Sequence, residues 1–106
     1  MGMVRGFFKQ ADVAVAAADA ADADPVDIPD YSAGFVVSTS GTGTISWWAE
    51  DPSTGTFHAA LDQDGTAIET TVGAINTAIA TPDPLHSFGT VKAVGFAGVI
   101  NIFFKG

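Results

Sequence analysis

Apolar and polar residues alternate along the middle of the chain, residues 43–72. Three alternating runs are separated by two clusters of Pro, Gly, Asp and Ser, a pattern typical of antiparallel strands joined by tight turns. Because successive side chains of a strand point to opposite faces, each run has one apolar face. We predict a three-stranded meander with those faces turned inward. The inner residues are Ile45, Trp47 and Ala49 in the first strand, Phe57, Ala59 and Leu61 in the second, and Ile68, Thr70 and Val72 in the third.

Further strands are predicted on both sides of this meander. Residues 35–39 form a short apolar run before it, and residues 75–79 alternate after it. The closing runs, residues 90–96 and 99–104, are separated only by a short Ala-Gly link, which predicts a hairpin. Residues 31–106 thus contain about seven short strands and no amphipathic helical stripe. We predict an all-β domain, either an antiparallel β-sandwich or a small barrel-like jelly roll.

Residues 1–30 differ in composition from the predicted sandwich. They begin with an apolar and basic patch and continue as an Ala-rich stretch that contains six Asp residues. Such small, acidic side chains bury little surface, so we predict a non-globular N-terminal arm over residues 1–30, either helical or extended. Pro25 and Pro29 mark its end. Asp12 and Asp19 interrupt its apolar residues, so neither a signal peptide nor a membrane span is predicted.

The composition limits the partners that we expect. The 106 residues are enough for one domain, and they carry 4 Lys and Arg against 12 Asp and Glu, a formal net charge of -8. Such a chain repels a phosphate backbone, so nucleic acid is not an expected partner. There is no cysteine, which removes disulfides, thiolate chemistry and cysteine-ligated zinc. Hydrophobic residues make up 47% of the chain and charged residues 15%, so we expect part of the surface to meet another protein.

The segment Asp62–Gly65 resembles the start of a calcium-binding loop, in which alternating carboxylates surround a hard cation. A complete EF-hand loop also needs a Glu at its twelfth position, and this sequence lacks that Glu. The flanking residues predict strands rather than helices. We therefore interpret Asp62–Gly65 as a hairpin turn and predict no metal site.

No arrangement of catalytic residues is predicted. His58 and His86 are the only histidines, and no Ser lies in a nucleophile-elbow pattern; His58 is also predicted on the outward face of its strand. Glu50 and Asp51 are adjacent in a strand, so their carboxylates cannot flank one substrate atom. The Gly-rich run at residues 40–44 is followed by neither a Lys nor a helix, unlike a phosphate-binding loop. We expect a non-enzymatic protein without a cofactor.

Two aromatic residues, Trp48 and Phe103, are predicted to point away from the core. Strand alternation places Trp48 on the face opposite Trp47, and Phe103 on the face opposite Ile102. Burial of a large aromatic side chain is favourable by about 4–6 kcal/mol before ordering costs. Three arrangements would therefore cover Trp48: the arm or a loop of the same chain, a subunit interface, or a sugar ring stacked on the indole.

The apolar and basic patch at the start of the arm is the second predicted contact region. Its apolar side chains are buried favourably only if a groove accepts them, and we expect that groove on a neighbouring copy or on another protein. Its two cations add attraction to an acidic surface. The predicted partner-binding residues are Met3, Val4, Arg5, Phe7, Phe8, Lys9, Trp48 and Phe103.

The turns of the meander and the closing strand carry a family resemblance. It lies in the run Thr44–Ala49, the turns Asp51–His58 and Leu61–Ile68, and the closing strand Ile102–Gly106. Through these features residues 35–106 resemble small β-sandwich structural proteins of tailed bacteriophages. Some members of that group are decoration or cement proteins on the capsid exterior.

This resemblance implies a virion structural protein, in the first place a capsid decoration (cement) protein. Such a protein would bind the major capsid protein or another virion protein, would form homo-oligomers and would lie on the capsid exterior. The same pattern also fits a tail or neck component. From the residues alone two other functions stay open, namely a carbohydrate-binding module that uses Trp48 and a small hydrolase.

Overall fold

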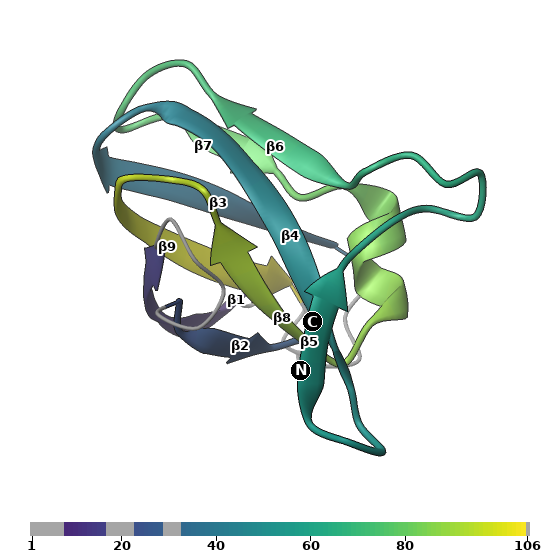
Figure 1. Ribbon diagram of the computed structural model, residues 1–106. Coiled ribbons are helices and arrows are strands. Elements are labelled where there is room, and N and C mark those ends of the chain that lie inside the picture. Colours follow the sequence, from purple (N-terminus) through teal and green to yellow (C-terminus); the bar gives the residue numbers. More distant parts are fainter. Residues whose placement is uncertain (1–7, 17–22, 29–32, 106) are drawn as a thin grey trace.

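The computed structural model describes residues 8–16, 23–28 and 33–105. Over these ranges the chain forms nine strands in two sheets, which confirms the predicted all-β sandwich (Figure 1). The one helical element there is a five-residue 3-10 helix, and no helix of these ranges is long and apolar enough to cross a membrane. In chain order the elements are β1 (Phe8–Ala16), β2 (Pro25–Asp27), β3 (Ala33–Ser40), β4 (Gly43–Asp51), β5 (Thr56–Ala59), β6 (Glu69–Val72), β7 (Ala78–Ala80), η1 (Asp83–Ser87), β8 (Thr90–Val94) and β9 (Gly98–Lys105).

Each sheet combines strands that are distant in the sequence. Sheet A has the order β1-β9-β3-β7, and sheet B has the order β2-β8-β4-β5, with β6 also paired to β4. All of these pairs are antiparallel. The strands from β3 to β9 lie close to the runs that the alternation predicts after residue 31. The sequence pattern therefore locates these strands correctly, although it does not choose their partners.

The inner faces of the two sheets enclose one hydrophobic core. Val36 and Ile102 come from sheet A, Ile45 and Trp47 come from sheet B, and each is at most 1% exposed. The Trp47 indole donates its Nε1–H to the Thr70 hydroxyl at 3.0 Å, so the polar atom of the buried ring is paired. The predicted inner residues of the first and third runs are confirmed. They are Ile45, Trp47, Ala49, Ile68, Thr70 and Val72, and all six are buried.

The predicted inner face of the second run is wrong. The register with β4 places Ala59 opposite Trp48 and Phe57 opposite Glu50, on the outer face of sheet B. Ala59 is exposed, and Leu61, beyond the end of β5, is 49% exposed. Alternation within a strand defines two faces, but only the pairing with a neighbouring strand decides which face turns inward.

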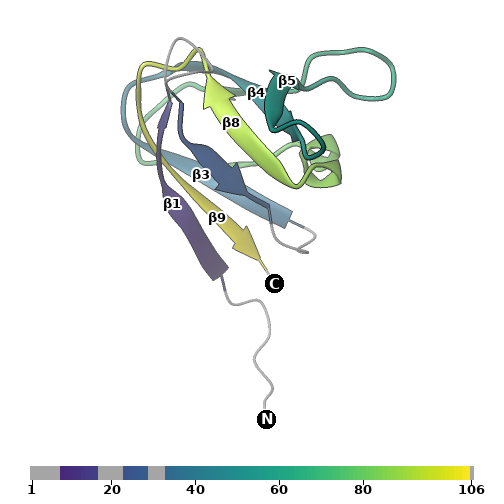
Figure 2. The same ribbon diagram turned by 60° about the horizontal axis from the view of Figure 1, so that its bottom comes forward.

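The predicted meander is also wrong in its connections. β5 pairs with the second half of β4 and β6 with the first half, so the two strands follow one edge of β4 instead of pairing with each other. Trp47 lies at the junction, where its carbonyl accepts from the Ala60 N–H at 2.9 Å and its N–H donates to the Ile68 carbonyl at 3.1 Å. Residues 61–67 leave the sheet between these two bonds as a projecting hairpin (Figures 1 and 2).

The predicted closing hairpin is replaced by a crossover between the sheets. β8 pairs with β2 and β4 in sheet B, whereas β9 pairs with β1 and β3 in sheet A. Phe96 lies between the two strands and is only 1% exposed, so the link is anchored in the core. Gly98 then passes so close to β3 that a Cβ would clash with the Ser40 carbonyl oxygen. Only glycine allows this approach of the two backbones.

The prediction of an arm outside the sandwich, residues 1–30, differs from the structure. β1 pairs with β9 at one edge of sheet A, and β2 pairs with β8 in sheet B. Val26 of β2 is 3% exposed and belongs to the core. Both described parts of residues 1–30 are therefore strands of the sandwich, and residue 30 is not its boundary. Backbone hydrogen bonds hold these strands, because a ladder does not depend on side-chain volume.

Candidate interaction surfaces

Trp48 lies on the outer face of sheet B and is half-buried, as the alternation predicts. Its direct neighbours across the strands are Ala59 of β5 and Lys92 of β8. The Lys92 ammonium is 4.4 Å from the centroid of the Phe57 ring, a cation–π contact on the same face. Glu50, opposite Phe57, is also half-buried. The face therefore combines aromatic area with the Lys92 cation and with carboxylates, among them Glu50 and Glu69.

The outer face of sheet A is more apolar. Phe103 of β9 lies opposite Phe35 of β3, and the two rings stack with their centroids 5.0 Å apart and an interplanar angle of 23°. Such a cross-strand aromatic pair stabilises a sheet and also forms a flat apolar surface. Uncharged side chains surround it on the described part of the face. They are Val37, Ala78, Ala80, Val99 and Asn101, of which the two alanines are exposed and the others half-buried.

Sequence reasoning identified Phe103 but missed Phe35. The available signal was the same alternation, because Val36 belongs to the core and its neighbour Phe35 must therefore point outward. The pairing of β3 with β9 brings the two phenylalanines together, and that pairing joins segments far apart in the chain. The aromatic pair was therefore predictable residue by residue but not as a pair.

The predicted N-terminal contact patch is only partly described. Met3, Val4, Arg5 and Phe7 lie outside the described residues. Phe8 and Lys9 begin β1, where their backbones pair with Lys105 and Phe104 of β9. The structure thus brings the start of β1 to the edge of sheet A and beside the end of β9, away from Trp48 on sheet B.

The segment Asp62–Gly65 forms a hairpin turn, as predicted. The Asp62 carboxylate accepts from the backbone N–H groups of Asp64 and Thr66, each at 2.9 Å, and the Asp62 carbonyl accepts from Gly65 at 3.0 Å. Gly65 has φ +85°, the left-handed conformation that follows this turn. The carboxylate that would begin a calcium loop is therefore directed at backbone amides. In residues 8–16, 23–28 and 33–105 no three His, Cys, Asp or Glu side chains are placed to hold a metal ion.

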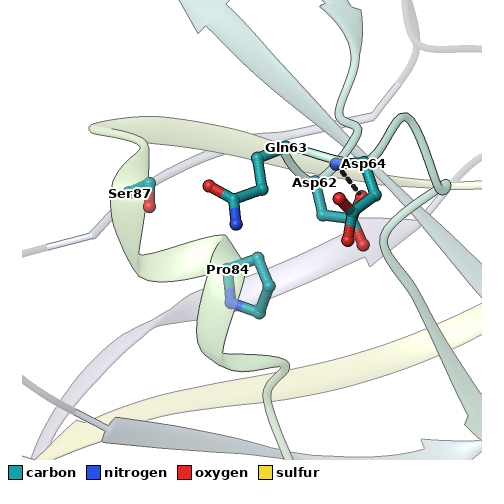
Figure 3. A pocket seen from close by; sticks show the side chains of 5 residues that line it. All are labelled: Asp62, Gln63, Asp64, Pro84 and Ser87. Atoms are coloured by element: carbon teal, nitrogen blue, oxygen red, sulfur yellow. Dashed lines mark hydrogen bonds between the residues drawn. The ribbon is translucent and has the colours of Figure 1, made fainter.

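A pocket of about 360 Å³ lies between this hairpin and η1. Figure 3 shows the Gln63 side chain directed toward Pro84 and Ser87 of η1, with Asp62 and Asp64 on the hairpin side. Its lining is polar and acidic, and the Asp62 carboxylate already serves the turn. The pocket offers no nucleophile paired with a base.

The turn between β4 and β5 is built on Asp51. Its carboxylate accepts from the Ser53 hydroxyl at 2.7 Å and from the Ser53 N–H at 2.9 Å. These bonds, first the hydroxyl and then the amide, lower the pKa of the Asp51 carboxyl below its ordinary value of 3.8, with a further contribution from His58. The carboxylate is therefore a structural anion at neutral pH.

The two histidines occupy different settings. The register pairs His58 with Ala49 and so places it on the inward face of β5, which corrects the predicted outward orientation. His58 is nevertheless exposed, because this end of β5 extends beyond the core. The His86 imidazole Nε2 lies 3.0 Å from the Thr81 hydroxyl beside η1, a contact within the fold. Thr81 is only 6% exposed, so the hydroxyl that contacts His86 is not open to a substrate.

A second pocket, of about 330 Å³, opens where β4 and β5 reach the end of the sandwich. We name it the β4–β5 pocket. It is lined by Glu50, Asp51, His58, Ala60, Leu61 and Phe88, among others. Apolar side chains and the two carboxylates line it together.

Comparisons of the chain with protein-family models, with curated proteins and with solved structures find no match. The surfaces themselves therefore carry the functional argument. They consist of a stacked aromatic pair on sheet A, a Trp-centred face on sheet B and a pocket lined by apolar residues and two carboxylates at one end. All three are suited to binding another molecule.

Proposed function

We propose that this chain is a non-enzymatic virion structural protein, a capsid decoration protein that binds an assembled shell. The observation that supports the proposal is the outer face of sheet A, where Phe35 and Phe103 stack at 5.0 Å among uncharged neighbours. A flat, partly accessible apolar face is typical of a contact with another protein, because it offers buried area without a cleft for a substrate.

The charge distribution supports the same function. The chain has a formal net charge of -8, yet the side chains described around the Phe35–Phe103 pair are uncharged, and the charged residue that follows Phe103 in β9 is the cation Lys105. The acidic remainder keeps free copies soluble through mutual repulsion. The apolar face can then contact a partner without desolvating a carboxylate, which would cost several kcal/mol.

The proposed partner is the major capsid protein or another virion protein on the capsid exterior. Neighbouring copies of the chain would contact each other through the N-terminal patch and Trp48. A tail or neck component would use the same surfaces, so the location on the particle must be measured directly.

The test is recovery of the chain with assembled particles. Virions are purified on a density gradient from cells that produce this protein, and their proteins are quantified by peptide mass spectrometry. The proposal predicts many copies per particle. A chain found only in the soluble fraction would contradict it.

A pair of variants tests the face itself. Phe103→Thr should reduce the copies recovered per particle at least tenfold, because it removes half of the aromatic pair while Thr remains suited to a strand. Ile75→Thr is the matched control, since Ile75 is 46% exposed and lies outside the strands of sheet A. Both variants are first checked for unchanged folding by circular dichroism.

Trp48 supports a second candidate, a carbohydrate-binding module. It is half-buried on a sheet face beside Lys92 and near Glu50, and polar groups around an aromatic platform suit a sugar ring. A titration with a panel of glycans would change the Trp fluorescence of the chain, and Trp48→Thr would abolish that change. Particle recovery without any glycan response favours the decoration function.

A further inference from the structure

We infer that residues 3–7 of one copy dock into the β4–β5 pocket of a second copy, so that copies associate head to tail. The inference rests on the proposed function, because it assigns a receptor to the N-terminal patch on a neighbouring copy. It concerns a contact between copies, which can be measured without any particle.

The β4–β5 pocket has apolar lining residues beside an exposed leucine. Leu61 is 49% exposed and lines a pocket of about 330 Å³ together with the half-buried Phe88 and the buried Ala60. An exposed Leu beside a concave apolar surface is stabilised when a partner side chain removes both from water, at about 25 cal/mol per Å². The size of the pocket suits one aromatic side chain and its neighbours.

The β4–β5 pocket also carries negative charge. Glu50 and Asp51 line the pocket, and Asp51 is held as an anion by the Ser53 hydrogen bonds. A partner segment therefore needs a cation next to its apolar residues. His58 lines the same pocket, so the occupant meets one imidazole as well as two carboxylates.

The chain itself contains a matching segment. It has only four Lys and Arg residues, and Arg5 lies within the run Met3-Val4-Arg5-Gly6-Phe7. Among the other cations, Lys92 faces Phe57 on sheet B, whereas Lys9 and Lys105 belong to the paired strands β1 and β9 of sheet A. Residues 3–7 therefore combine aromatic, aliphatic and cationic side chains in a segment free of carboxylates, which complements the pocket.

The positions of β1 and β5 indicate that a neighbouring copy supplies the segment. In Figure 2 β1 begins at the lower end of sheet A, whereas β5 and the projecting hairpin lie on the opposite, upper side. A neighbouring copy can bring its pocket to the segment, and this contact is heterologous, so it builds a ring or an open chain.

The test is sedimentation velocity of the full chain over a concentration series. The wild-type chain should self-associate. Phe7→Ser, which alters the segment, and Leu61→Ser, which alters the pocket, should each weaken self-association at least tenfold. Ile75→Ser is the matched control, because Ile75 is 46% exposed, close to the 49% of Leu61, and does not line the pocket. It should associate like the wild type.

Mixing the two defective variants tests the head-to-tail geometry. The Phe7→Ser chain keeps an intact pocket and the Leu61→Ser chain keeps an intact segment, so an equimolar mixture should form dimers that do not grow further. Charge reversal gives an independent check, since Arg5→Glu and Glu50→Arg should each disrupt association. A circular dichroism melt of every variant confirms folding.

Several results would overturn the inference. They are a monomeric wild-type chain at every concentration, association that survives both Phe7→Ser and Leu61→Ser, and a mixture of the two variants that stays monomeric. A monomeric chain in which Phe7→Ser increases the accessibility of the pocket would instead show docking within one copy. The Leu61→Ser chain retains the outer face of sheet A. Its recovery with particles therefore tests binding to the shell separately from the contact between copies.

Discussion

Trp47 combines three roles at a single position. Its indole fills the core, its Nε1–H is paired with Thr70 at 3.0 Å, and its backbone joins β4 to both Ala60 and Ile68. A buried donor without an acceptor costs about 1–3 kcal/mol. We therefore expect the Thr70 hydroxyl to have a large effect on the free energy of unfolding.

Thr70→Val tests this pairing. The substitution keeps the shape of the side chain but removes the acceptor, so the free energy of unfolding should fall by about 1–3 kcal/mol. Thr71→Val, at the exposed neighbouring position of β6, is the control and should change stability by less than about 0.5 kcal/mol. Equal effects of the two substitutions in urea unfolding would show that the hydrogen bond is not what stabilises the core.

A substitution at Gly65 tests the backbone conformation of the projecting hairpin. A Cβ at this position would meet nothing within 4 Å, so the φ of +85° is the only source of strain. Gly65→Ala should therefore destabilise the fold by about 1 kcal/mol. Gly73→Ala also meets open space but has no positive φ, and it should be neutral or slightly stabilising. Thermal unfolding of the two variants distinguishes backbone strain at a positive φ from the effect that any Gly→Ala substitution has on stability.

Asp51 predicts a dependence of stability on pH. The folded-state pKa of its carboxyl lies below the ordinary 3.8. The ionised carboxylate therefore contributes to the free energy of unfolding above pH 3.8, and this contribution is lost as the pH falls through the folded-state pKa. Asp51→Asn should lower stability at about pH 7, and this difference should shrink toward about pH 3. Ser53→Ala should reproduce part of the loss at neutral pH. A difference between wild type and Asp51→Asn that is the same at both pH values would contradict the assignment.

At the scale of elements, β1 is the most informative strand. It pairs with β9 over most of its length, with an irregularity between Gln10 and Val13, and it forms one edge of sheet A. Removing it would leave the backbone groups of β9 unpaired and would create a new sheet edge. Residues 8–16 are therefore part of the folded domain.

Two truncations separate the strand from the residues before it. Deleting residues 1–7 should leave the melting temperature nearly unchanged, because it removes no part of β1. Deleting residues 1–16 should cost about 3 kcal/mol or more and promote aggregation, because several ladder hydrogen bonds are lost. A stable, monomeric 17–106 fragment would show that β1 is dispensable.

The sequence pattern locates strands well where large and small side chains alternate. Ile45, Trp47 and Ala49 are assigned correctly because one face must leave water. β1 and β2 are missed because their ladders with β9 and β8 depend on strands about 90 and 60 residues away. The outward position of Phe57 is missed for a related reason, since the register with β4 is a nonlocal property.

The candidate surfaces likewise depend on strand pairing that a local sequence pattern does not contain. Trp48 and Phe103 follow from alternation alone, and both are half-buried on outer faces. The Phe35–Phe103 stack, the Lys92–Phe57 contact and the β4–β5 pocket each join residues from different strands. Their assembly requires the sheet order, which no local pattern contains.

At the scale of the molecule, the surfaces divide binding between separate regions. Sheet A carries the stacked Phe35–Phe103 pair, and the ends of β4 and β5 in sheet B border a pocket lined by apolar residues and two carboxylates. The proposed decoration function would use the first surface against a shell and the second against neighbouring copies. The two can be disrupted independently, because Phe103 and Leu61 belong to different surfaces.

The most direct measurement of the proposed function is electron cryomicroscopy of purified particles that contain this chain. The proposal predicts sandwich-shaped density on the capsid exterior, with the Phe35 and Phe103 face of sheet A against a shell protein. Density at the tail or neck with the same face buried would relocate the protein without changing its mode of binding. Particles without such density, or a sandwich attached with Phe35 and Phe103 exposed to solvent, would contradict the account.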